Sequence, residues 1–203
     1  MVRAVVFDVG NVLYHWSPSA LYSKLIPDAQ ERDWFLSHVV TPAWHFQHDA
    51  GRPFSETSAE LIAQFPAYRA LIEAWGPRFD ETITGPVEGM IALVELLDAA
   101  HVPLFAITNF SAEFWVDFRA RRADVFDRFT DIIVSGTERM MKPEPAIYQL
   151  ARERFALNAN EALFVDDRIE NVATAQAQGF IGHHFINHAG LAPVLAAHHL
   201  PTG

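Results

Sequence analysis

The sequence contains no cysteine, which excludes disulfide bonds and thiolate chemistry and gives no sign of an oxidising compartment. Lysine is nearly absent too, since Lys24 and Lys142 are the only two in the chain. Acidic residues outnumber basic ones, and the formal net charge is −10 at pH 7. A surface of that charge repels phosphate backbones and anionic lipids, so we exclude nucleic acids and membranes as main partners.

A long hydrophobic run is also missing. No stretch approaches the roughly 20 apolar residues of a membrane-spanning helix, and no charged leader with a cleavage site precedes the strand-like pattern that follows Met1. The 203 residues are 50% hydrophobic and 20% charged, as is typical of globular proteins. We therefore expect a soluble, cytoplasmic protein made of one large domain, or of a core with an insertion.

Five short apolar runs have the length of β-strands. They lie at residues 2–7, 102–108, 131–135, 162–165 and 181–186. Because the runs are continuous rather than alternating, they are typical of parallel strands that are covered on both faces. Helical patterns at 87–100, 146–155 and 171–178 separate them. This alternation predicts an α/β fold with a doubly wound parallel sheet and a Rossmann-like core.

Residues 16–82 do not follow this alternation. More than ninety residues separate the first two predicted strands, far more than a crossover connection needs. The segment contains six prolines and four of the five tryptophans, and it has no clear strand pattern. We therefore expect a helical cap at 16–82, inserted into an α/β hydrolase-like core formed by 1–15 and 83–203. Ligands in such sheets bind beyond the carboxyl ends of the strands, so the cap is placed to act as a lid.

Polar residues stand where the predicted strands end and where one helix begins. They are Asp8, Thr108, Asn109, Lys142, Asp166 and Asp167. Each has an ordinary structural alternative, such as a helix cap or a solvated cation. Together they bring a carboxylate, a hydroxyl, an ammonium group and an acid pair to one edge of a parallel sheet. The adjacent acids repel each other, and a divalent cation would relieve that repulsion.

In these residues the chain resembles the haloacid dehalogenase superfamily of hydrolases, over essentially its full length. FDVGNVL is similar to the first family motif except at its second acid, and ITNFS, KPEPAIY and FVDDRIEN are similar to the second, third and fourth motifs. The predicted insertion looks like the helical cap of the subgroup that carries its cap after the first strand. The resemblance implies a Mg²⁺-dependent phosphatase that acts on a small phosphorylated metabolite, with sugar phosphates among the candidates.

The resemblance also implies a role for each polar residue. Asp8 would attack phosphorus and form an aspartyl-phosphate intermediate. Mg²⁺ would be held by Asp8, the Gly10 backbone carbonyl and Asp167, with Asp166 binding it directly or through water.

The remaining motif residues would contact the phosphoryl group. Lys142 would pair with Asp8 and a phosphoryl oxygen, while Thr108 and the Asn109 amide would hold the other oxygens.

Gly10 stands where family phosphatases carry the acid that protonates the leaving alcohol. Loss of general acid–base catalysis typically costs ~10²–10⁴ in rate, so we expect good leaving groups, such as those of hexose-1-phosphates, acyl phosphates or aryl phosphates, to be favoured. Candidates for a replacement proton shuttle are His15, His45, His48 and Asp49. We expect Trp44, His45 and His48 to face the site from the cap.

Three alternatives to a phosphatase stay open at this point. Haloacid dehalogenases also lack the second acid of the first motif and need no metal, but both Asp166 and Asp167 are present here, which favours phosphate chemistry. A carbon–phosphorus hydrolase would need Lys24 as a Schiff-base lysine in the cap. A catalytically weak phosphometabolite-binding protein would need no working nucleophile. Neither the substrate nor the oligomeric state can be read from the sequence.

Overall fold

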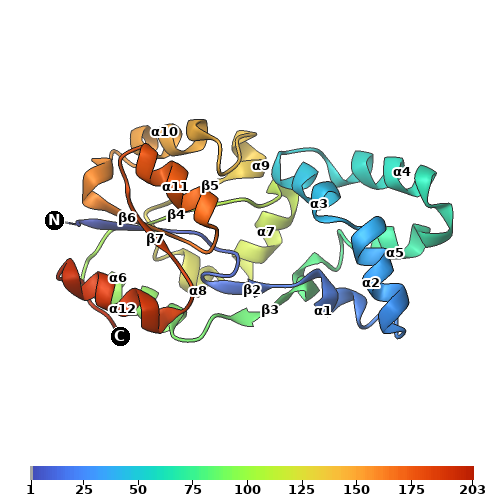
Figure 1. Cartoon of the computed structure of the whole chain (residues 1–203), viewed down its shortest axis with the longest axis horizontal. Coiled ribbons are helices and arrows are strands. Elements are labelled where there is room, and N and C mark those ends of the chain that lie inside the picture. The colour runs from blue at the N-terminus through green and yellow to red at the C-terminus, as the bar shows by residue number, and fades with distance from the viewer. Residues whose placement is uncertain (1) are drawn as a thin grey trace.

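The computed structural model describes residues 2–203, and a five-stranded sheet runs through one half of it (Figure 1). Its strands are β1 (Ala4–Phe7), β4 (Leu104–Thr108), β5 (Asp131–Val134), β6 (Ala162–Asp166) and β7 (Ile181–His184). The order is β5-β4-β1-β6-β7, and every pairing is parallel. The predicted doubly wound α/β fold is thus confirmed. Met1, the expected first residue of the core, lies outside the described residues.

Both faces of the sheet are buried, and β1 shows why its sequence does not alternate. All four of its residues are buried. Val5 and Phe7 point into one hydrophobic cluster, whereas Ala4 and Val6 point into the other. A strand with two apolar faces reads as a continuous apolar run.

Helices cover each face of the sheet (Figure 1). Residues of α6 (Met90–Ala99) and α12 (His188–Ala197) belong to the cluster on one face. Residues of α10 (Pro145–Arg154) and α11 (Ile169–Ala177) belong to the cluster on the other. The remaining elements of this half are α7 (Ala112–Ala120), α8 (Ala123–Phe126), α9 (Ser135–Glu138) and the 3₁₀-helix η3 (Ala159–Glu161).

The inserted segment, residues 16–82, forms the other half of the molecule, at the end opposite both chain termini (Figure 1). Its helices are α1 (Pro18–Tyr22), α2 (Ala29–His38), α3 (Pro42–Asp49), α4 (Phe54–Gln64) and α5 (Arg69–Ala74), with the 3₁₀-helices η1 (Pro66–Tyr68) and η2 (Phe79–Thr82). Within residues 2–203 there is no helix with both the length and the apolar character that crossing a lipid bilayer requires.

The boundaries of this segment carry a feature that the sequence pattern did not predict. At its two ends, β2 (Tyr14–Trp16) and β3 (Ile83–Pro86) pair as a two-stranded antiparallel ribbon. Two short strands with mixed burial give no periodic signal. The prolines of the segment act as helix starts as well as breaks: Pro42 opens α3, where the Thr41 side chain accepts a hydrogen bond from the Trp44 N–H at 3.2 Å.

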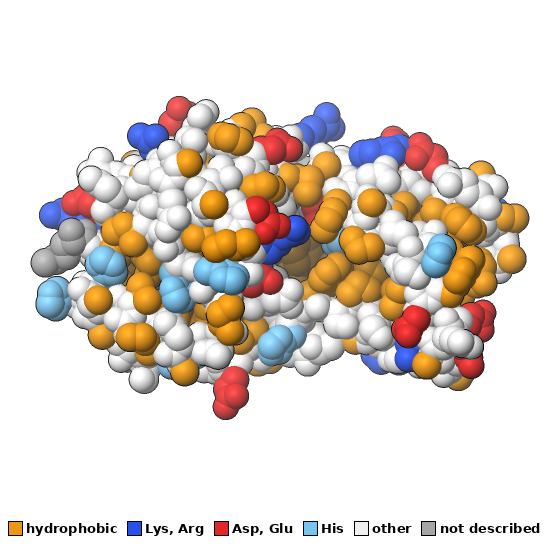
Figure 2. Space-filling model, viewed as in Figure 1, with side chains coloured by type: hydrophobic (Ala, Val, Ile, Leu, Met, Phe, Trp, Pro, Cys, Tyr) orange, Lys and Arg blue, Asp and Glu red, His pale blue; other side chains and the backbone are white. Residues whose placement is uncertain are grey.

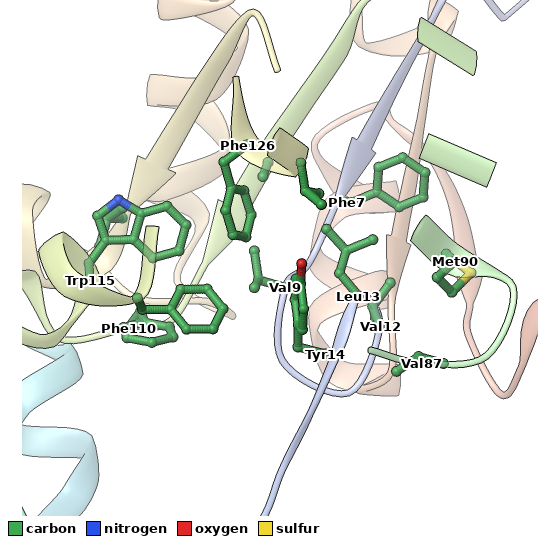
Figure 3. Close-up of a cluster of buried hydrophobic side chains, with 14 of the residues drawn as sticks. Phe7, Val9, Val12, Leu13, Tyr14, Val87, Met90, Phe110, Trp115 and Phe126 are labelled. Atoms are coloured by element: carbon green, nitrogen blue, oxygen red, sulfur yellow. The ribbon is translucent and has the colours of Figure 1, made fainter. Parts of the chain in front are cut away.

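The loop that follows β1 is anchored by its own apolar side chains. Val9, Val12 and Leu13 are almost fully buried. Figure 3 shows Val9, Leu13 and Tyr14 in the same cluster as residues from several other elements. The Leu13 and Tyr14 N–H groups both donate to the Val9 carbonyl, so the chain turns back at once. Asp8, Gly10 and Asn11, which adjoin these anchors in the chain, are therefore held in place at the sheet edge.

Several predicted boundaries differ from the observed ones by a few residues. β1 begins at Ala4 rather than at residue 2, and β6 extends to Asp166. Ser135 begins α9 instead of ending β5. These shifts arise because the apolar pattern shows burial, whereas a strand ends where its backbone pairing ends.

Two neighbouring leucines of α6 test whether burial at the sheet sets stability. We expect Leu97→Ala to lower the free energy of unfolding by about 2–5 kcal/mol, because Leu97 is fully buried and its loss leaves a cavity. The matched control Leu96→Ala should change it by only about 0.5 kcal/mol, because Leu96 is 40% exposed. Urea unfolding measures both changes, and equal losses would contradict the packing described here.

Candidate active site

Three adjacent strands deliver polar side chains to one point of the sheet edge. Asp8 follows β1, Asn109 follows β4, and Asp166 ends β6. The chain moves outward from β1 to β4 and β5, and then crosses to β6 on the other side of β1. Asp8 and Asp166 therefore lie at the point where the winding reverses, which is where open α/β sheets bind ligands.

Lys142 links these two carboxylates. Its Nζ lies 2.8 Å from Asp8 Oδ1 and 2.7 Å from Asp166 Oδ2, and the side chain is almost fully buried. Burial lowers the pKa of Lys142, but the Asp166 and Asp8 carboxylates outweigh burial and raise it above its ordinary value. Lys142 is therefore a permanent ammonium group in this site.

The Asn109 side chain fixes the backbone of Lys142 from the neighbouring loop. Its Nδ2 donates to the Lys142 carbonyl at 2.8 Å, and its Oδ1 accepts from the Lys142 N–H at 2.9 Å. Because both ends of the amide are used in this way, the Asn109 side chain acts here as a clamp on Lys142.

The Asp8 carboxyl is held at one oxygen. Its Oδ1 accepts a hydrogen bond from the Val9 N–H at 2.7 Å as well as the contact from Lys142. Burial raises the pKa of Asp8 to about 7; Lys142 opposes this rise, and the Asp166 and Asp167 carboxylates add to it. A further cation at this point would favour the ionised form.

Asp166 is saturated with donors. Besides Lys142, its oxygens accept from the Arg168 N–H at 2.9 Å and from Asn171 Nδ2 at 2.9 and 3.1 Å. It is fully buried and does not line the cavity described below. Asn171 was missed by the sequence reasoning, although it stands five residues after Asp166 in the quoted FVDDRIEN. A polar residue in the first turns of the following helix was the available signal.

The acids form a cluster with the character of a cation site. One ligand oxygen each from Asp8, Asp166 and Asp167 lie within 4.8 Å of one another. Burial and the neighbouring Asp166 raise the pKa of Asp167, while Lys142 and a hydrogen bond from Asn11 oppose the rise. Three carboxylates against one ammonium group leave an excess of negative charge. Hard oxygen donors suit Mg²⁺ better than zinc, so these residues fit the predicted metal.

A cavity of about 160 Å³ opens above this cluster, between the sheet edge and the inserted segment. In the space-filling view the molecule is hollowed between its two halves, and hydrophobic side chains surround much of the hollow (Figure 2). Polar residues of the floor include Asp8, Asn109, Lys142, Asp167 and Asn171. The apolar and aromatic residues of the walls are Val9, Tyr14, Trp16, Phe46, Phe79, Ile83, Phe110 and Phe118. Gly10 also lines the cavity.

Five predicted site residues do not line this cavity: Asp166, as described above, and Thr108, His15, Trp44 and His48. Thr108 is buried at the end of β4, and His15 is exposed on β2. Trp44 donates from Nε1 to the Thr57 carbonyl at 3.2 Å, and His48 Nε2 lies 2.6 Å from Thr57 Oγ1. The structure therefore differs from the expectation that Trp44 and His48 face the site.

The rotation of α3 about its own axis explains why Trp44 and His48 do not face the cavity. Residues four apart share a helix face, so Trp44 and His48 pack together inside the inserted segment. His45 and Asp49 share the adjacent face, and both line the cavity. His45 stacks on Trp16 with ring centroids 4.8 Å apart. Burial lowers the pKa of His45 to about 3, so its ring is neutral at neutral pH.

The comparisons with known proteins agree with this geometry. The family model of the haloacid dehalogenase-like hydrolases matches residues 2–179. The chain is 26% identical over 188 residues to the sesquiterpene phosphatase astK of Aspergillus oryzae, covering 90% of this chain and 89% of that protein. It is 28% identical over 188 residues to a phosphoglycolate phosphatase of Yersinia pseudotuberculosis, covering 88% of this chain and 78% of the relative.

Solved structures are similar in fold. A HAD family enzyme from Bacteroides thetaiotaomicron, in complex with magnesium and inorganic phosphate, has a TM-score of 0.69 at 17% identity, covering 92% of this chain and 96% of that chain. An L-2-haloacid dehalogenase from Xanthobacter autotrophicus, with chloropropionic acid covalently bound, has a TM-score of 0.63 at 18% identity, covering 99% of this chain and 85% of that chain. At such identities the likeness shows the fold alone.

The two lysines allow a test of whether the buried Lys142 ammonium group is needed to neutralise the Asp8 and Asp166 carboxylates. Lys142→Met should lower the free energy of unfolding by about 3–5 kcal/mol, because it leaves Asp8 and Asp166 buried without their cation. The loss should be larger at about pH 8 than at about pH 5. Lys142 opposes the rise of the pKa of Asp8 in the native protein, so its loss should raise that pKa further above about 7. The folded variant then holds the Asp8 proton over a wider pH range than the native protein does, and its stability falls further as the pH rises from about 5 to about 8.

Lys24→Met is the matched control, because Lys24 forms an exposed ion pair with Glu81. Its effect should stay within about 1 kcal/mol at either pH. Urea unfolding at both pH values measures the two variants. A Lys142→Met variant as stable as the control would contradict the proposed balance.

Proposed function

The chain belongs to the haloacid dehalogenase-like hydrolase family, and we propose that it is a Mg²⁺-dependent phosphatase that hydrolyses a small phosphomonoester through an aspartyl-phosphate on Asp8. The observation that carries this proposal is the arrangement of Lys142 between Asp8 and Asp166, beside Asp167, on the floor of the cavity. We further propose that the inserted segment, residues 16–82, is the cap that covers the substrate.

Neighbouring groups engage one of the two carboxylate oxygens of Asp8, and the other is the proposed nucleophile. Its Oδ1 is engaged by the Val9 N–H and by Lys142, so Oδ2 is the atom that we assign to the attack on phosphorus. The new bond joins Asp8 to phosphorus while the bond to the leaving oxygen breaks, and water later cleaves the aspartyl-phosphate. Lys142 would contact both Asp8 and a phosphoryl oxygen, which reduces the repulsion between the two anions.

The acid cluster would hold the metal. Asp8, Asp167 and the Gly10 carbonyl are the proposed direct ligands. Asp166 would act through water or by orienting Lys142, because its oxygens already accept hydrogen bonds. When bound, Mg²⁺ would supply the charge that offsets the approach of a carboxylate to a phosphate. Thr108 and the backbone amide of Asn109 stay predicted contacts of the phosphoryl oxygens, since the Asn109 side chain is engaged on Lys142.

Known phosphatases among the relatives support phosphate as the substrate group. The sequence relatives include a sesquiterpene phosphatase and a phosphoglycolate phosphatase, and a structural relative was solved with magnesium and inorganic phosphate. The acid pair Asp166 and Asp167 supports the same choice over a dehalogenase, for which a cation site has no use. Lys24 pairs with Glu81 and does not line the cavity, so a Schiff-base mechanism has no support.

The cavity walls favour an apolar organic group on the substrate. Above the polar floor the lining is mostly aromatic and aliphatic, with Trp16, Phe46 and Phe79 contributed by the inserted segment. A sugar would leave several hydroxyl groups without partners against such walls, and unpaired buried polar groups are costly. We therefore propose a phosphorylated apolar alcohol as the substrate, in place of the sugar phosphate that was a candidate from the sequence.

Removal of the nucleophile tests the mechanism. Asp8→Asn should abolish hydrolysis of p-nitrophenyl phosphate and prevent formation of an aspartyl-phosphate, because the amide is a poor nucleophile of nearly the same shape. Asp33→Asn, an exposed residue of the same type in the inserted segment, should keep full activity. Rapid-quench labelling and steady-state rates, with Mg²⁺ and with a chelator, measure the effect. Turnover by Asp8→Asn, or turnover of 2-chloropropionate without Mg²⁺, would contradict the proposal.

A substrate comparison tests the apolar walls. We expect kcat/KM for an isoprenyl monophosphate to exceed that for a hexose-1-phosphate by at least ~10-fold, since an added apolar group in such a pocket is worth roughly 10–200-fold. Trp16→Ala should reduce this ratio because it removes part of the wall. Trp34→Ala is the control, because Trp34 is 41% exposed and away from the cavity. A preference for the sugar phosphate in the native protein would contradict the substrate class.

A further inference from the structure

The loop after Asp8 offers no group that could protonate a leaving oxygen. Gly10 lines the cavity without a side chain, and a Cβ added to it would meet nothing within 4 Å. Alkyl phosphates need a proton on the departing oxygen, since an alkoxide is a poor leaving group. If the proposed phosphatase acts on an apolar alcohol phosphate, that proton has to come from another element.

Asp49 is a buried carboxyl on the cavity wall that the ion pairs of the floor do not use. It is 2% exposed, and it comes from the last turn of α3 in the inserted segment. Its Oδ2 lies 3.4 Å from His45 Nε2, whereas its Oδ1 is buried and no donor within residues 2–203 reaches it with normal hydrogen-bond geometry. The Ser111 backbone interacts with the carboxyl only weakly enough to oppose the rise of its pKa without reversing it. A buried carboxyl oxygen without a partner is destabilising, so it needs a compensating role or a bound group.

We propose that Asp49 is the catalytic acid and base that replaces the residue missing at Gly10. This inference rests on the proposed function. As the bond between Asp8 and phosphorus forms, Asp49 gives its proton to the leaving oxygen, and the alcohol departs. Water then attacks phosphorus and Asp49 takes a proton from it, while the bond between Asp8 and phosphorus breaks. Inorganic phosphate leaves, and Asp8 and Asp49 both return to their starting states.

Although Asp49 belongs to the inserted segment, its backbone is packed against the core of the molecule. The Asp49 carbonyl accepts a hydrogen bond from Ser135 Oγ at 2.6 Å, at the start of α9. Two residues later, Gly51 has a φ of +89°, and a Cβ there would lie 2.8 Å from the Gly136 carbonyl oxygen. Only glycine permits both this backbone conformation and this approach, so the end of α3 is seated directly on the β5–α9 junction.

The charges around Asp49 suit a group that both gives and takes a proton. Burial and the Asp8 carboxylate raise its pKa to about 7, while the Ser111 backbone and Lys142 oppose the rise. His45 on the same helix is neutral at this pH and adds no charge. The other charged groups lining the cavity are Asp167 and Arg168. Asp49 therefore exchanges its proton near neutrality, where general acid–base catalysis is most effective.

Asp49→Asn separates this role from a structural one. With an alkyl phosphate, kcat should fall by ~10²–10⁴-fold. With p-nitrophenyl phosphate, whose leaving group needs no proton, the first turnover should keep its rate within about threefold and appear as a burst. The aspartyl-phosphate should then accumulate, because its hydrolysis has lost its base. In the pH profile for the alkyl substrate, the limb that falls above about pH 7 should disappear.

Two further variants keep the test decisive. Asp33→Asn should behave as the native protein with both substrates. Gly10→Asp added to Asp49→Asn should recover at least ~10-fold of the lost rate, because Gly10 has room for a side chain and lines the same cavity. Asp49→Ala replaces Asp49→Asn if the latter fails to fold.

The outcomes distinguish this proposal from the proposed function. Equal losses for alkyl and aryl phosphates, or no loss with either, would overturn the role of Asp49, while rapid-quench labelling of Asp8 in the native protein would still support the aspartyl-phosphate. Absence of labelled Asp8 in both the native protein and Asp49→Asn would instead overturn the aspartyl-phosphate mechanism itself.

Discussion

The arrangement on which the rest of this site depends is a single buried ammonium group held between two carboxylates. Lys142 reaches Asp8 from one strand end and Asp166 from the next, and its removal would leave both acids buried without a counter-charge. An apolar strand can end on a buried carboxylate only where such a partner exists. Backbone pairing sets the spacing of β1 and β6, and the need for a counter-charge holds Lys142 against both strand ends, which brings together the charges that phosphoryl transfer requires.

Polar residues in the site fall into two groups according to whether their hydrogen bonds are satisfied. The Asn109 side chain uses both of its polar atoms on the Lys142 backbone, and Asn171 Nδ2 donates to Asp166, whose oxygens also accept from Lys142 and Arg168. These hydrogen bonds stiffen the floor of the cavity. Asp49 has an unpaired buried oxygen, and Asp167 lies on the cavity surface. The free-energy cost of burying an unpaired Asp49 oxygen is tolerated because the neighbouring polar side chains are hydrogen-bonded. Unsatisfied groups that converge on one cavity are typical of sites that bind or react.

The sequence predicted the floor of the site far better than its walls. Asp8, Asn109 and Asp166 could be placed together because parallel strand ends meet at one edge, whatever the surrounding detail. Residues on α3 could not be placed in this way, because the orientation of a short helix depends on how it packs. A rotation of one residue position decides whether His48 or Asp49 faces the cavity, and no periodic pattern in WHFQHDAG distinguishes them. The β2–β3 ribbon was missed for a similar reason: its strands are too short to show a period.

Moving a proton-transfer group from the core loop to the inserted segment would change what the segment does. With an acid at position 10, the chemistry would be complete in the core, and the segment would serve mainly to select the substrate. With Gly10 and Asp49, the site is complete only when α3 is seated on the β5–α9 junction through Ser135 and Gly51. In this arrangement the aromatic residues of the segment also enclose the cavity, which would exclude water while the proposed aspartyl-phosphate forms. Binding of an apolar group against those walls would favour the same position of α3 that brings Asp49 to the leaving oxygen. Substrate recognition and assembly of the proposed catalytic groups would then occur together.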